Sequence, residues 1–156
     1  MLTTSTPITL ANFLKTSSLE ASPAWEYVEG NVYQKPMPKA HHSRLQLKLA
    51  AAINGVAEDA EVAAAFPELR CTFAGRSLVP DITVLRWVNI PITETGELLS
   101  GALPQPPDWT IEILSPGQSS TQVIDNILFC IEQGTTLGWL VDPSDRGIFV
   151  FRPDQA

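Results

Sequence analysis

The amino-acid sequence predicts an α/β protein of the α+β kind, with a mixed β-sheet flanked by helices and preceded by an N-terminal helix and a β-hairpin. Apolar residues recur at helical spacing between 41 and 59. Runs rich in Val, Ile, Thr and Trp are separated by turn residues between 61 and 116. A strand, a helix and a strand follow over 108–143, which is the order of a right-handed parallel crossover. The length of 156 residues fits a single domain spanning residues 1–156.

The N-terminal third predicts a short helix and a hairpin. A helix is expected from Pro7 to about Ser17, with Pro7 at its first position and Thr6 as its cap. Alternating aromatic and polar residues predict a hairpin from Trp25 to Gln34, turning at Gly30-Asn31. The alternation alone makes Glu26 a solvent-facing residue of that hairpin.

The rest of the chain alternates between strands and helices. Residues 35–39 contain two prolines and form a stiff connector to the long helix. A long loop rich in Pro and Gly is expected between 86 and 107. A second helix is expected from about Thr121 to Gln133, with Gly134 as its C-terminal stop. The expected strand runs are 61–66, 69–73, 78–85, 108–116, 137–143 and 148–151.

The charge is acidic and unevenly distributed. The formal net charge is −7 at pH 7. Residues 1–50 carry five lysines and arginines against three acids, whereas the remainder carries five arginines against fourteen acids. An acidic average field disfavours non-specific nucleic-acid binding, which depends on neutralising phosphates, although a metal-loaded site and a local basic patch still permit it. No lysine follows Lys48.

Cysteine usage and hydropathy indicate a cytoplasmic protein. Cys71 and Cys130 are isolated, which favours reduced, buried thiols over a disulfide framework. The N-terminus is rich in Thr and Ser, and no apolar run approaches the roughly 18 residues of a membrane span. We therefore expect neither a signal peptide nor a membrane partner.

Two apolar runs each contain one carboxylate where a core would exclude it. Asp81 follows Val79-Pro80, and Glu112 lies between Ile111 and Ile113. Two such carboxylates on neighbouring strands would repel by roughly 4 kcal/mol at about 4 Å, and a divalent cation between them would turn that repulsion into binding. The alternative is that each lies half exposed at a strand end or is paired with an arginine, because structural ion pairs also place carboxylates in strands.

The order of the motifs resembles a known family. Val79-Pro80-Asp81 on one strand and Glu112 on the next, before a helix, resemble the PD-(D/E)XK nuclease pattern. The chain is more closely similar to the Uma-type family of restriction endonuclease-like proteins. The resemblance extends from Trp25 to about Phe151 and rests on these stretches: 25–30, 38–49 with His42, 79–82, 112–116 and 134–143.

The resemblance implies a restriction-endonuclease-like fold and a metal site. It implies that Asp81 and Glu112 converge on Mg²⁺ or Mn²⁺, with the carbonyl of Ile113 as a third protein ligand. It also implies that Glu26 points into the site, as a further ligand or as the base that orients water. The reaction would be metal-assisted hydrolysis of a phosphodiester bond.

The chain departs from the family at the lysine. The usual lysine two residues beyond the acid is Leu114 here. The helix position from which this family commonly supplies it matches Asn126, and an acidic position one turn earlier matches Gln122. Losing one such electrostatic contact typically costs about 10²–10³ in rate. Where the geometry permits, Arg70 or Arg76, or Lys39 from the connector, is expected to supply the missing positive charge.

Two functions from different classes follow. The first is a metal-dependent endonuclease acting on nucleic acid, with DNA expected, in which Asp81 and Glu112 bind the ion, Glu26 assists, and Asn126 and Gln122 position water or phosphate. The second is a nuclease fold that has lost catalysis and binds nucleic acid or a protein partner. The retained carboxylates favour the first, and Asn126 favours the second. A homodimer is also expected, because duplex DNA has a two-fold symmetry that endonucleases often match.

Overall fold

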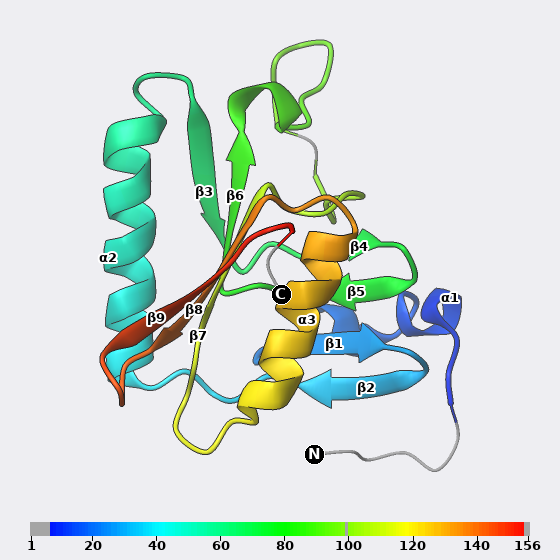
Figure 1. Ribbon diagram of the computed structural model, residues 1–156. Helices are drawn as coiled ribbons and strands as arrows, with labels where there is room; N and C mark the ends of the chain where they lie inside the picture. The colour runs from blue at the N-terminus through cyan, green and yellow to red at the C-terminus, as the bar shows by residue number, and fades with distance from the viewer. Residues whose placement is uncertain (1–6, 99, 155–156) are drawn as a thin grey trace.

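A computed structural model describes residues 7–98 and 100–154 and shows two β-sheets with helices packed around them (Figure 1). One sheet has the strand order β2-β1-β5-β4, and the other has the order β3-β6-β7-β8-β9. The strands of the first sheet are β1 (Trp25–Val28), β2 (Asn31–Gln34), β4 (Cys71–Phe73) and β5 (Arg76–Leu78). Those of the second are β3 (Ala63–Pro67), β6 (Ile82–Arg86), β7 (Trp109–Ile113), β8 (Leu137–Asp142) and β9 (Gly147–Phe151). The α-helices are α1 (Leu10–Phe13), α2 (Ala40–Ala57) and α3 (Ser120–Glu132), and the 3₁₀ turns are η1 (Ser17–Glu20) and η2 (Trp87–Asn89).

The five-stranded sheet separates α2 from α3 (Figure 1). Side chains alternate between the two faces of a strand. On β7, Ile111 and Ile113 pack in the same cluster as Ala50 of α2. Glu112 belongs to the opposite face and lines a cavity together with residues of α3. The predicted mixed sheet and parallel crossover are confirmed, because β7 and β8 are parallel and α3 connects them.

The single strand expected over residues 78–85 is two strands in different sheets. β5 ends at Leu78, β6 begins at Ile82, and Val79-Pro80-Asp81 carries the chain from one sheet to the other. Proline has no backbone N–H to contribute to a sheet, so Pro80 suits a break between two ladders. Asp81 therefore lies at the junction of the sheets instead of inside a strand.

Two other N-terminal expectations need correction. The hairpin turns at Glu29-Gly30, one residue earlier than expected, and both residues have positive φ (50° and 85°), as a tight two-residue hairpin turn requires. Helix α1 is shorter than expected and is capped by Thr9, whose side chain accepts a hydrogen bond from the backbone of Asn12. The expected cap, Thr6, lies outside the described residues.

The described residues between β6 and β7 form an excursion from the sheet. It contains η2 and is fixed by bridges between Ile92 and Leu98 and between Leu103 and Cys71. Trp87, within it, is 39% exposed. Cys71 and Cys130 are free and buried, as predicted. No helix in the described part of the chain is long and apolar enough to cross a membrane.

Helix α3 packs closely on β8 because position 138 has no side chain. A Cβ atom at Gly138 would lie 2.5 Å from Cγ2 of Ile127, a β-branched side chain that is 1% exposed. We predict that Gly138→Ala lowers the free energy of unfolding by about 1–3 kcal/mol through overpacking, measured by urea denaturation. Gly55→Ala is the matched control, since a Cβ there meets nothing within 4 Å, and it should raise stability by about 0.5–1 kcal/mol. Equal effects of the two substitutions would contradict this packing.

Candidate active site

Asp81 and Glu112 lie side by side in the interior. The antiparallel register that pairs Ile82 with Ile111 brings Asp81 opposite Glu112. Their exposed fractions are 4% and 6%, so neither is half exposed at a strand end. Two carboxylates buried this close together cannot both stay ionised unless a cation lies near them.

Lys35 supplies that cation. Its ammonium nitrogen lies 3.1 Å from Oδ1 of Asp81 and 3.0 Å from Oε1 of Glu112, and it donates a 2.6 Å hydrogen bond to the carbonyl of Val79. Asp81 and Glu112 are thus paired with a lysine, not with one of the arginines. Sequence reasoning missed Lys35 and treated it as part of a connector. The only available signal was that two buried acids need a cation and that five basic residues lie before position 50.

The hairpin delivers Lys35 to the junction of the sheets. Lys35 follows the last residue of β2, and its backbone N–H donates to the carbonyl of Ala24 at 2.8 Å, extending the pairing of β1 and β2. Pro36 then turns the chain away toward α2. Lys35 therefore joins the four-stranded sheet to both acid-bearing segments of the other sheet.

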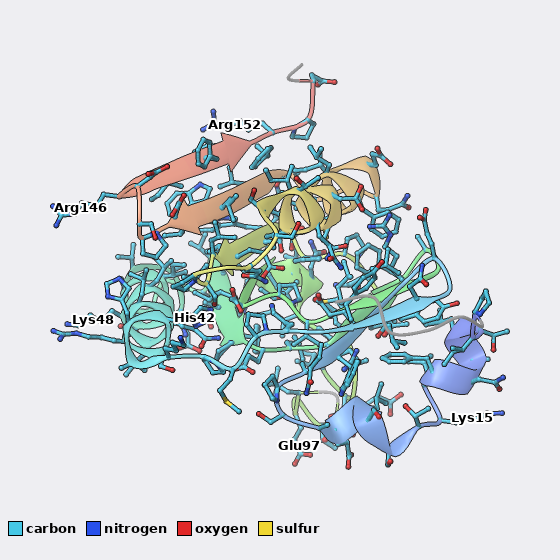
Figure 2. All side chains as sticks on the ribbon, turned by 90° about the horizontal axis from the view of Figure 1, so that it is seen from below. Lys15, His42, Lys48, Glu97, Arg146 and Arg152 are labelled. Atoms are coloured by element: carbon cyan, nitrogen blue, oxygen red, sulfur yellow. The ribbon has the colours of Figure 1, made fainter. Side chains whose placement is uncertain are left out.

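Asp81 is held by further donors. The backbone N–H of Ile113 donates to its Oδ2 at 2.7 Å, and Nε2 of His42 lies 3.3 Å from the same oxygen. The side chain of Gln46 donates to the backbone carbonyl of Asp81 at 2.8 Å. Figure 2 shows His42 on the side of α2 that faces the rest of the molecule, whereas Lys48 of the same helix extends away.

Glu26 is buried and not solvent-facing, which corrects the expectation from alternation alone. Its Oε2 accepts a 2.8 Å hydrogen bond from the backbone N–H of Val79, and it is 7% exposed. The alternation failed because both faces of β1 are covered. Tyr27, on the other face, packs against Phe13 and donates to the carbonyl of Ile8.

The three acids and Lys35 shift one another's pKa values. Burial raises the pKa of Glu112, Asp81 and Glu26 raise it further, and Lys35 opposes the rise. Burial also raises the pKa of Glu26. Burial alone would raise the pKa of Asp81, but Lys35, His42 and the Ile113 N–H together hold it below its usual value. Burial would lower the pKa of Lys35, but Glu112, Asp81 and Glu26 raise it well above its usual value, so the ammonium stays charged.

Three of these four groups border a cavity of about 330 Å³. Glu26, Lys35 and Glu112 form one wall, and α3 forms another. The structure brings Gln122 and Asn126 of α3 to this cavity as well. Asp81 borders a small adjoining cavity, together with Lys35 and His42.

The three basic residues considered from sequence do not pair with Asp81 or Glu112. Arg70 donates to Ser77 and to the carbonyls of Leu19 and Trp25. Arg76 donates to Asn126 and Asp125 on α3. Lys39 lines a separate cavity beside His41.

Carboxylate oxygens such as those of this site are ligands that hard divalent ions prefer. Lys35 contacts two of these oxygens, one from Asp81 and one from Glu112. Mg²⁺ is commonly held by one or two carboxylates while it keeps several waters. Within residues 7–98 and 100–154, no group of three His, Cys, Asp or Glu side chains is placed to hold a metal ion. Asp81 and Glu112 are donors of the type that such an ion prefers, but the Lys35 ammonium lies between them.

Comparison with known proteins identifies the family. The model of the family Uma2, described as "Putative restriction endonuclease", matches residues 10–156. The chain belongs to the Uma2 family. A crystal structure of an Anabaena variabilis ATCC 29413 protein, described as a putative nuclease belonging to DUF820, superposes with a TM-score of 0.91 at 51% identity. The match covers 96% of this Uma2 chain and 82% of the Anabaena chain, which confirms the predicted fold. No curated protein matches.

We predict that Lys35→Met lowers the free energy of unfolding by about 3–5 kcal/mol, because it leaves two buried carboxylates without a cation. Urea denaturation would measure the change. Lys48→Met, on the exposed side of α2, is the matched control and should change stability by no more than about 0.5 kcal/mol.

Adding Glu112→Gln to the Lys35→Met variant should recover part of the loss, since only one buried carboxylate then needs a partner. A Lys35→Met protein as stable as Lys48→Met would show that the bridge does not neutralise the pair.

Proposed function

We propose that this Uma2 protein is a metal-dependent endonuclease that hydrolyses phosphodiester bonds of DNA. The observation that supports it best is the arrangement of Asp81, Glu112 and Lys35, two buried carboxylates and an ammonium, at the edge of a cavity. Stability alone does not explain such an arrangement, because an apolar core of the same volume is often at least as stable as a buried ion pair.

In this proposal Asp81, Glu112 and the Ile113 carbonyl hold a Mg²⁺ or Mn²⁺ ion. The ion, when bound, lowers the pKa of a coordinated water and neutralises charge on the transferring phosphoryl group. The Ile113 N–H and His42 keep Asp81 ionised and fixed in orientation. Glu26 serves as a further ligand or as the base that orients water, from its position on the same cavity wall.

Lys35 takes the place of the lysine that the family pattern lacks here. Its ammonium contacts both carboxylates and offsets one of their two negative charges before an ion binds. Lys35 lines the same cavity as the α3 wall. When it withdraws from the carboxylates it remains within reach of that cavity, where its charge stabilises a bound phosphate. The chain then needs no lysine at Leu114 or Asn126, because Lys35, the residue after β2, supplies the positive charge.

The alternative function is a nuclease fold that binds nucleic acid or a protein partner without cutting. One observation favours it: Lys35 satisfies Asp81 and Glu112 without any metal ion. The two functions differ in whether the carboxylates and Lys35 are needed for hydrolysis.

A supercoiled-plasmid nicking assay with Mg²⁺ or Mn²⁺ tests the proposal. Wild type should nick the plasmid, and Glu112→Gln and Lys35→Met should each lose at least about a hundredfold in rate. Lys48→Met should cut like wild type. A wild type that is inactive with both metals, or a Glu112→Gln variant that cuts normally, would contradict the endonuclease and favour the binding module.

A further inference from the structure

One face of the N-terminal half of α3 lines the cavity. Ser119, Gln122, Val123 and Asn126 are spaced i, i+3, i+4 and i+7, and all four border the cavity. Ser119 is the N-cap of this 13-residue helix, and its hydroxyl accepts from the N–H of Gln122 at 3.5 Å. The N-terminal end of α3, where the helix dipole is positive, therefore borders the cavity, with the N–H groups of Gln122 and Val123 bonded to Ser119.

Asn126 lies at the deep end of this face, with its amide group fixed in one orientation. It is 5% exposed, and NH1 of Arg76 donates to its Oδ1 at 3.1 Å. A guanidinium only donates hydrogen bonds, so the atom that faces Arg76 must be the amide oxygen. The amide NH₂ consequently points away from Arg76, and no described residue accepts a hydrogen bond from it.

Arg76 is itself held rigidly. It is 7% exposed, pairs with Asp125 at 3.0 Å, and lies 4.1 Å from the ring centroid of Phe129. Glu29 approaches from the hairpin at 3.8 Å. A cation bound to an amide oxygen polarises the amide and makes its N–H groups stronger donors. The Asn126 NH₂ thus offers two strengthened donors to the cavity, where none of the described residues accepts a hydrogen bond from it.

We propose that the α3 face of the cavity is a phosphate subsite, in which the Asn126 NH₂ donates to a phosphate oxygen of the DNA backbone and Arg76 is a positioning residue. The Gln122 side chain and the positive N-terminal end of the α3 dipole complete it. Glu26 and Glu112 on the facing wall repel a phosphate. Lys35 and the α3 donors attract it and offset that repulsion. This subsite rests on the proposed function, because the phosphate that it binds belongs to the DNA substrate.

Binding to a short, fluorescein-labelled DNA duplex tests the subsite, measured by anisotropy in EDTA so that no cleavage occurs. Asn126→Asp keeps an acceptor for Arg76 and removes the NH₂, and should weaken binding at least about tenfold. Gln133→Glu adds the same charge at the exposed far end of α3 and is the matched control, which should bind like wild type. An Asn126→Asp affinity equal to that of Gln133→Glu, or a wild type that does not bind the duplex, would overturn the proposal.

NMR of the wild-type protein gives a second, direct readout. The side-chain NH₂ resonances of Asn126 are assigned by their absence in Asn126→Asp, and they should shift when the duplex is added. Arg76→Met should reduce both the shift and the affinity, because the amide is then free to rotate. NH₂ resonances that do not move on binding would assign Asn126 a purely structural role.

The outcome is separable from the endonuclease proposal. Plasmid nicking with unaffected Asn126→Asp binding would remove the subsite alone. Subsite binding without nicking would remove the endonuclease alone and leave a phosphate-binding module.

Discussion

The ammonium of Lys35 is the interaction on which the rest of the site depends. Two carboxylates buried within a few ångströms of each other cannot both be ionised without a cation, and Lys35 contacts both at 3.0–3.1 Å. Lys35 belongs to the hairpin of one sheet, whereas Asp81 and Glu112 belong to adjacent segments of the other. The same contact that neutralises the pair therefore ties the two sheets together.

The backbone around Lys35 is arranged to serve this contact. The segment Val79-Pro80-Asp81 crosses between the sheets, and its first residue uses both backbone groups at the site. The Val79 carbonyl accepts from Lys35, and its N–H donates to Glu26. On the far side of the cavity, the missing side chain of Gly138 lets α3 approach the sheet, which places Asn126 and Gln122 opposite the acids. The break at Pro80 and the glycine at position 138 thus help to position groups from β1, β7 and α3 around one cavity.

Local patterns in the sequence predicted much of this molecule, and the misses share a physical cause. The long helix, the parallel crossover and the two acid-bearing segments were predictable because apolar periodicity and turn residues act over short separations. The break at Pro80 was not predictable, because an apolar run in the core has the same local pattern whether its residues belong to one sheet or to two. Glu26 was misassigned for a similar reason: alternation signals an exposed face only when one face of the strand meets water. Lys35 was missed because its partners lie 46 and 77 positions further along the chain. Local patterns contain no information about which distant cation pairs with two buried carboxylates.

Divalent-metal calorimetry on wild type, Lys35→Met and Lys48→Met tests the central claim most directly. If Asp81 and Glu112 are a cation site that Lys35 occupies in the absence of an ion, removing the ammonium should make Mg²⁺ or Mn²⁺ bind at least about tenfold more tightly. The metal should also stabilise Lys35→Met against urea more than it stabilises wild type, because it replaces the missing charge. Lys48→Met should match wild type in both measurements. Equal or weaker metal binding by Lys35→Met, or no binding by any of the three proteins, would contradict the account.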